Sequence, residues 1–134
     1  MTREIKFRGY NRKNNQWLYG FYLQNRGAHF VCPDEWATGK QWDDYQVEPE
    51  TVGQFVGFAD KNGKEIYEGD VVLWGKDSIK YIVSYTDGMF VAGLQDENLY
   101  GDLALWILCD EEEGDPCSII GNIHDNPELL KPSV

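Results

Sequence analysis

The sequence predicts an all-β protein, mainly strands with one short helix near the C-terminal end. Three observations predict this class. Short apolar runs alternate with polar residues at a period of two, turn-forming pairs such as Asp-Gly separate the runs, and no segment has the apolar spacing of a long helix. With 42% hydrophobic and 14% aromatic residues among 134, the chain can bury a core without disulfides.

A basic β-hairpin is predicted at the start of the chain. In REIKFRGYNRKNNQWLYGFYL, Ile5 and Phe7 alternate with polar residues, the chain turns at NRKNNQ, and an alternating apolar face resumes at Trp17. RGAHFVC then indicates a short strand. Residues 33–50 mix proline, glycine, carboxylates and two tryptophans without a helical period, which predicts an irregular segment with room for one short helix.

A second hairpin is predicted in the middle of the chain. Residues 53–59 and 66–74 have the pattern of strands, and the segment DKNGKE lies between them. The Asn-Gly pair of this segment tolerates the positive φ that a tight type I′ turn requires. The Gly-Asp pair just before VVLW is a further turn signal, of the kind that introduces the first strand of a small barrel.

Short strands continue toward the C-terminal end. KYIVSY and MFVAGL flank residues 86–88, whose Asp-Gly pair is a strong hairpin signal between apolar runs. Residues 103–108 and 118–123 are further strand candidates, and an acidic loop at 110–116 separates them. About five short strands therefore follow residue 66, at the spacing of an SH3-like barrel.

The tail predicts one helical turn. Asn126 is an N-cap candidate, Pro127 would stand at the first helical position, and Leu129 and Leu130 would dock the turn. The predicted domains are a basic N-terminal β region with an irregular loop, residues 1–57, and an SH3-like β-barrel with a C-terminal helical turn, residues 58–134.

Charge is distributed unevenly along the chain. Twelve basic and 23 acidic residues give a net charge of −11, yet residues 1–26 contain six basic residues and one acidic residue, a net of +5, which leaves −16 on the remainder. A chain with this total repels phosphate backbones, so we do not expect duplex nucleic acid as a partner. The opposite charges of the two parts instead favour a homo-oligomer, in which the basic region of one subunit meets an acidic surface of its neighbour.

Apolar runs and cysteines indicate the compartment. The sequence lacks an apolar run of membrane-spanning length, and MTREIKFRGY lacks the apolar core of a signal peptide, so we expect a cytoplasmic protein without membrane contact. Cys32, Cys109 and Cys117 are odd in number and form no CxxC pair, which predicts reduced thiols rather than disulfides. Together with His29 they would make an unusually dispersed zinc site, and no metal or cofactor is predicted.

Two groups of residues are candidate sites. Glu65, Glu68 and Asp70 form a carboxylate cluster that general acid–base or metal chemistry could use, although a turn that caps its own backbone explains the same residues. A calcium loop starting at Asp60 fails, because its sixth and twelfth positions are Glu65 and Val71. The candidate binding surface is basic and aromatic and consists of Lys6, Arg8, Tyr10, Arg12, Lys13 and Trp17.

Three stretches together resemble the YopX-like proteins of bacteriophages and prophages. They are REIKFRGYNRKNNQWLYG, QFVGFADKNGKEIYEGDVV and IIGNIHDNPELL, which span nearly the whole chain. The resemblance implies a phage-encoded, β-rich cytoplasmic protein and brings no catalytic residue. The central stretch has the glycines and turn formers of a fold signature, and its structural residues are Asn62, Gly63, Tyr67, Glu68, Gly69 and Asp70.

These observations favour a non-enzymatic binding or assembly module. The expected partner is a second copy of the chain, or else a phage or host protein. A small enzyme that uses the carboxylate cluster is the first alternative, and a nucleic-acid-binding or DNA-mimic protein is the second. An exposed turn at the carboxylates would count against the enzyme.

Overall fold

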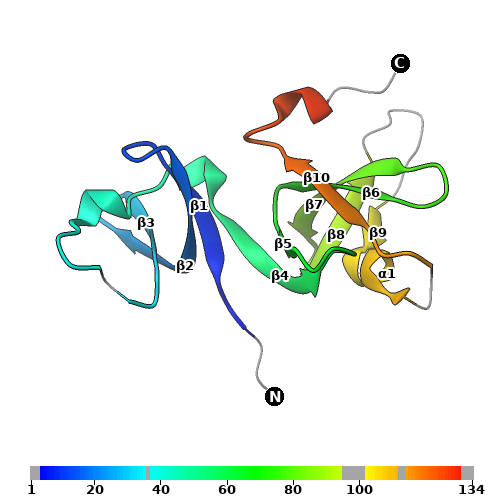
Figure 1. Cartoon of the computed structure of the whole chain (residues 1–134), viewed down its shortest axis with the longest axis horizontal. Helices are drawn as coiled ribbons and strands as arrows, with labels where there is room; N and C mark the ends of the chain where they lie inside the picture. Colours follow the sequence, from blue (N-terminus) through cyan, green and yellow to red (C-terminus); the bar gives the residue numbers. More distant parts are fainter. Residues whose placement is uncertain (1–3, 36, 95–101, 112–113, 131–134) are drawn as a thin grey trace. The chain divides into compact units, whose positions relative to one another are not determined.

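The computed structural model describes residues 4–35, 37–94, 102–111 and 114–130. The chain divides into two compact units, Met1–Phe55 and Val56–Val134, whereas the sequence placed the boundary after residue 57. Strands dominate both units, which confirms the predicted all-β class (Figure 1). Among the described residues, no helix has the length and apolar character needed to cross a membrane.

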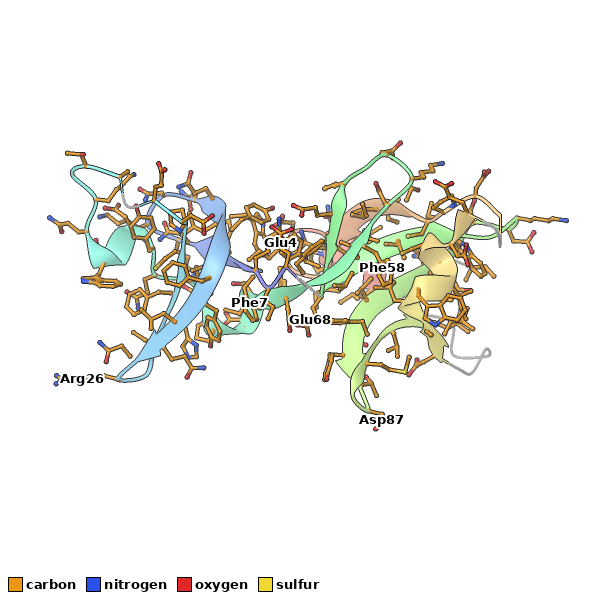
Figure 2. All side chains as sticks on the ribbon, turned by 90° about the horizontal axis from the view of Figure 1, so that it is seen from below. Glu4, Phe7, Arg26, Phe58, Glu68 and Asp87 are labelled. Atoms are coloured by element: carbon orange, nitrogen blue, oxygen red, sulfur yellow. The ribbon has the colours of Figure 1, made fainter. Side chains whose placement is uncertain are left out.

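The first unit is built on an antiparallel meander. The strands β1 (Phe7–Asn11), β2 (Gln16–Asn25) and β3 (Ala28–Cys32) lie in the order β3-β2-β1, which confirms the predicted hairpin and the short strand after it. On the other side of β1, the start of β4 (Gly53–Ala59) pairs through Gly53 and Gln54. Arg26, at the tip of the β2–β3 turn, takes a positive φ of 51° (Figure 2).

The segment after β3 contains two short 3-10 helices, η1 (Trp42–Asp44) and η2 (Pro49–Thr51), where the sequence predicted an irregular stretch with one short helix. Its backbone pairs with the sheet: the N–H groups of Val47 and Glu48 donate to the carbonyls of His29 and Tyr10, both at 2.9 Å. The buried core of this unit includes Phe30, Cys32 and Tyr45. An irregular segment thus completes the unit by covering the meander.

The second unit contains an open antiparallel sheet in the order β10-β6-β7-β8-β9. Its strands are β6 (Asp70–Trp74), β7 (Ile79–Thr86), β8 (Met89–Leu94), β9 (Asp102–Ala104) and β10 (Ser118–Asn122). Within the described residues β10 and β9 remain at the two edges, so the closed SH3-like barrel that the sequence predicted is not confirmed. The core cluster of this unit comprises Val56, Ile66, Val72, Tyr81, Val83, Ala92, Leu105, Leu108 and Cys117.

The predicted strand at residues 66–74 is two strands. β5 (Glu65–Tyr67) lies next to the second half of β4, and β6 starts at Asp70 after a turn in which Gly69 has a φ of 92°. The N–H group of Gly69 donates to the carbonyl of Val83 at 2.8 Å, which joins this turn to β7. The turn predicted from the Gly-Asp pair is therefore confirmed. The apolar residues on both sides of it led to the prediction of one continuous strand where the structure has two.

The two predicted hairpin turns differ in type. Asp87 and Gly88 have φ values of 53° and 83°, the two positive angles of a type I′ turn, and Asp87 lies at the hairpin tip (Figure 2). At the β4–β5 turn Gly63 also has a positive φ, 81°, but Asn62 does not, so the predicted type I′ turn is wrong there. The Gly63 N–H instead donates to the Asp60 carbonyl at 3.0 Å, so Asp60–Gly63 form a β-turn whose last residue is the left-handed glycine.

The strand predicted at residues 103–108 is also wrong. β9 ends at Ala104, and residues Leu105–Cys109 form the helix α1. Leu105 and Leu108, three positions apart on one helix face, are 1% and 0% exposed in the core. A strand would direct these two side chains to opposite faces, so burying both together favours the helical turn.

The tail forms the predicted helical turn, η4 (Pro127–Leu130), but it is attached differently. The Asn126 side-chain oxygen accepts a hydrogen bond from the Asn122 N–H of β10 at 3.2 Å. A Cβ added at Gly121 would lie 2.9 Å from Leu129, whereas Leu130 is 38% exposed. Leu129 therefore docks the turn, and residues 131–134 of the tail lie outside the described residues.

Candidate binding surface

Three residues of the predicted binding surface share one face of the β1–β2 hairpin. Tyr10 pairs with Trp17 across the strands, and their rings meet edge to face with centroids 5.6 Å apart. The Arg8 guanidinium carbon lies 4.9 Å from the centroid of the Trp17 ring. Because Arg8 is only 5% exposed, its charge is held against the aromatic ring instead of being presented to a phosphate backbone.

The other three cations of this surface form ion pairs within the first unit. Lys6 lies 3.1 Å from Glu4 and over the Phe55 ring at 4.9 Å. The Arg12 Nε lies 2.9 Å from the Glu48 Oε1. The six candidate residues therefore lie on or next to one hairpin, and the charges of Lys6, Arg12 and Lys13 are matched by nearby carboxylates.

Lys13 makes two of these ion pairs. Its Nζ lies 3.0 Å from carboxylate oxygens of both Asp43 and Asp44 in η1. Hydrogen bonds to Asp43 and Asp44 raise the pKa of Lys13. A backbone hydrogen bond from Gln41, then side-chain hydrogen bonds from Asn14 and Lys13, hold the pKa of Asp44 far below its usual range. Both groups stay charged near neutral pH, so the pair links the β1–β2 turn to η1.

The two units differ in net charge. The first unit contains seven basic and seven acidic residues and is neutral, although its first 26 residues carry +5. The second unit contains five basic and sixteen acidic residues and carries the whole net charge of −11. The basic hairpin was expected to meet an acidic surface of a neighbouring subunit; the structure shows Arg12 and Lys13 paired with the acidic segment of their own unit.

Sequence reasoning missed an exposed pair of aromatic residues in the first unit. Tyr19 and Phe21 of β2 stand on the same strand face and are 51% and 50% exposed. We call these two residues the β2 aromatic pair. Their alternation with polar residues was read as one face of a sheet, and only the structure shows that the middle of this face remains in solvent.

A shallow depression of about 370 Å³ lies in the first unit, between the β1–β2 turn, β3 and the segment that contains η1. Arg12, Lys13 and His29 line it together with acidic residues of both helical turns. His29 Nδ1 is hydrogen-bonded to the Tyr22 hydroxyl, and the two rings stack with centroids 5.8 Å apart. Of the residues that line the depression, Arg12 is paired with Glu48, and Lys13 is paired with Asp43.

The carboxylates singled out in the sequence serve the turns. Asp60 is 6% exposed, and its Oδ1 accepts hydrogen bonds from the N–H groups of Asn62 and Lys64, both at 2.9 Å. Its Oδ2 accepts a third bond from the Ile119 N–H at 3.0 Å. Burial disfavours the charged carboxylate, but these three backbone bonds outweigh it and lower the pKa of Asp60. Its oxygens are thus engaged by three backbone N–H groups, as those of a turn-capping carboxylate are.

The predicted carboxylate cluster has the same character. Asp70 is 2% exposed and its Oδ2 accepts a hydrogen bond from the Tyr67 N–H at 2.8 Å, across the β5–β6 turn. Glu65 begins β5, and Glu68 lies in the turn itself (Figure 2). Within the described ranges, no three or more His, Cys, Asp and Glu side chains gather as they would around a metal ion. Asp70 therefore caps the backbone of its own turn, and the turn is partly buried instead of exposed.

The zinc ligands considered in the sequence fall into separate units. His29 and Cys32 belong to β3 of the first unit, whereas Cys109 ends α1 and Cys117 precedes β10 in the second. All three cysteines are thiols, and burial raises the pKa of Cys32. The first unit therefore contains Cys32, and the second unit contains Cys109 and Cys117.

Comparison with known proteins gives a family and a fold. The family model described as YopX protein matches residues 6–131. The crystal structure of protein EF1440 from Enterococcus faecalis is similar to this chain with a TM-score of 0.59 and 24% sequence identity, over 97% of this chain and 100% of the other. At that identity the likeness concerns the fold alone. A comparison with curated proteins finds no match.

Proposed function

The chain belongs to the YopX family, and we propose that it works as a non-enzymatic assembly module of phage or prophage origin whose partner is a second copy of itself. The β2 aromatic pair carries this proposal. Two large apolar side chains, each about half exposed and adjacent on one strand face, are the kind of feature that protein interfaces bury at their centre.

The energetic case rests on the exposed halves of the two rings. An aromatic side chain buries about 150–250 Å², so covering the exposed half of Tyr19 or Phe21 removes about 100 Å² from water. At about 25 cal/mol per Å² this gives about 2 kcal/mol for each ring. Contributions of this size are typical of the few residues that dominate an interface.

Charge supports contact through the first unit. The second unit carries −11, so two second units repel each other, whereas two neutral first units approach without that penalty. The sequence suggested a contact between a basic and an acidic patch. Because Arg12 and Lys13 are already paired with Glu48, Asp43 and Asp44, we assign the main contribution to the apolar pair.

Light scattering on the purified chain tests the proposal. The expected result is a particle heavier than the 15.4 kDa monomer, with a mass that high salt does not reduce, because an apolar contact is not screened. A double variant, Tyr19→Ser with Phe21→Ser, should be monomeric while remaining folded. Tyr85→Ser is the matched control, since Tyr85 is 55% exposed on β7 of the second unit.

Three results would contradict the proposal. A wild-type chain that stays monomeric at all concentrations removes the second copy as partner. An oligomer that dissociates in high salt but tolerates the double variant points to charge contacts. An oligomer that Tyr85→Ser breaks and the double variant leaves intact moves the interface to the second unit.

A further inference from the structure

We propose that Cys109 and Cys117 form an oxidation-sensitive pair that closes reversibly into an intramolecular disulfide. The proposal concerns the second unit and is independent of the assembly proposed above. Cys109 is the last residue of α1, and Cys117 immediately precedes β10. A bond between them would join the end of the helix to the start of the edge strand.

The structure places the two cysteines beside each other. An interaction between their side chains raises the pKa of Cys109 and lowers the pKa of Cys117. The backbone keeps this contact in place, because the Cys117 N–H donates to the Leu108 carbonyl at 2.8 Å, and Leu108 is the residue before Cys109. Cys117 is 0% exposed in the core cluster and Cys109 packs against the same cluster. Two thiols whose backbones are joined in this way need little chain movement to bond.

Accessibility assigns different roles to the two thiols. Cys109 is half-buried and can be reached by a small oxidant, whereas Cys117 is fully buried and can react only with its neighbour. The interaction with Cys117, together with burial, raises the pKa of Cys109. The thiolate is the reactive form, so the first step should be slow at neutral pH and faster in alkali.

The reaction with a small disulfide such as oxidised glutathione is balanced. The Cys109 thiolate attacks one glutathione sulfur and forms a mixed disulfide, and the displaced glutathione thiolate takes up the proton that Cys109 lost. The Cys117 thiolate then attacks the Cys109 sulfur and releases the second glutathione, which takes the proton of Cys117. The two protein thiols lose two electrons in total, and one glutathione disulfide becomes two glutathione thiols.

A disulfide fits these residues better than a metal does. Asp60 is the carboxylate whose charge acts on both thiols, but its oxygens already accept three backbone hydrogen bonds. A soft metal ion would need further ligands, and within the described residues no group of three or more suitable side chains occurs. The third thiol, Cys32, belongs to the first unit and serves as an internal control.

The test is a redox titration of the full chain. The protein is equilibrated at increasing ratios of oxidised to reduced glutathione, quenched in acid, and its remaining thiols are alkylated and counted by mass spectrometry. We expect the count to fall from three to one, with a peptide pair linking Cys109 to Cys117 and a mass loss of about 2 Da for the two hydrogens. The oxidised form should melt at a higher temperature, because the bond closes the loop in the unfolded chain.

Variants separate this pair from other chemistry. Cys32→Ser should still lose two thiols, whereas Cys109→Ser should give no linked peptide. Cys117→Ser replaces a fully buried side chain, and if it fails to fold, peptide mapping of the wild-type protein decides alone. Three alkylatable thiols at the most oxidising ratio, a bond to Cys32, or a bond between two chains would each overturn the proposal.

Discussion

Replacing Asp60 by Asn tests whether one carboxylate joins the β4–β5 turn to β10. The Asn side chain keeps an oxygen where Asp60 accepts the hydrogen bonds of Asn62 and Lys64. At the other position it places an NH₂ group against the Ile119 N–H, so two donors face each other. The exchange therefore removes one bond and leaves the shape of the side chain unchanged.

The magnitude follows from that single bond. A hydrogen bond to a charged group contributes about 1.5–3 kcal/mol, so D60N should lower the free energy of unfolding of the second unit by about 2 kcal/mol. D60A removes both acceptor oxygens and all three hydrogen bonds, but the N–H groups of the exposed turn can bond to water instead, so we expect about 3–4 kcal/mol. D87N is the matched control, because Asp87 is exposed and Asn also tolerates its φ of 53°, and it should change stability by less than about 0.5 kcal/mol.

Urea unfolding at pH 7 and amide hydrogen exchange provide the two measurements. D60N should lower the urea midpoint and speed exchange of the Ile119 amide more than exchange in the first unit. If D60N unfolds at the same urea concentration as D87N, and the Ile119 amide stays as protected as in the wild type, the carboxylate does not hold β10 and the reasoning is wrong.

The pH dependence of stability provides an independent test of the role of the Asp60 carboxylate. The pKa of Asp60 is lowered in the folded chain, so its carboxylate contributes stability above the ordinary Asp pKa of about 3.9. That contribution disappears as the pH falls through the lowered pKa. The stability difference between wild type and D60N should therefore be full at pH 7 and shrink below about pH 4. A difference that grows in acid would contradict the assignment.

Three further predictions concern other parts of the chain. Gly63→Val should cost about 1 kcal/mol or more in urea unfolding, because a Cβ at Gly63 meets no atom within 4 Å and the cost is the strain of a φ of 81°; added calcium should leave the wild-type melting temperature unchanged. A labelled DNA duplex at physiological salt should show no anisotropy change, and submicromolar, salt-sensitive binding would show that Lys6, Arg12 and Lys13 remain available to phosphates. Asn11→Asp should lower the melting temperature of the first unit, because it directs a carboxylate at backbone carbonyls, and an unchanged melting curve would exclude that contact.

Local patterns predicted the strands and most of the turns. Alternation located the first hairpin and the strand at 28–32, and glycine at 63 and 88 took the positive φ that its freedom allows. The wrong strand prediction at LALWIL has a physical cause. A run of six apolar residues fits the two-residue period of a strand as well as the 3.6-residue period of a helix. The helix forms because it buries Leu105 and Leu108, three positions apart, in the same core.

Contacts between distant segments could not be predicted. Net charge along the sequence suggested a basic patch, but the carboxylates that neutralise Arg12 and Lys13 lie thirty or more positions later. The same applies to the cysteines, because only the fold brings Cys117 beside Cys109 while leaving Cys32 in another unit. Asp60 had a visible turn role as the residue before Lys-Asn-Gly, yet its bond to Ile119 spans 59 positions.

Two buried polar side chains hold an irregular segment in each unit, and their chemical types are fixed by what they face. The Asn11 NH₂ group, 1% exposed, points at the carbonyls of Asp43, Asp44 and Gln46 at 2.7–3.2 Å, so this position requires a donor. Asp60 faces only N–H groups and requires acceptors. N11D replaces a required donor by an acceptor, and D60N replaces a required acceptor by a donor, so both substitutions should lower stability. The size and hydropathy of Asn and Asp are too similar to predict this result. Because the Asp60 carboxylate can be protonated and the Asn11 amide cannot, acid should shrink the stability difference between wild type and D60N and leave the hydrogen bonds of Asn11 unaffected.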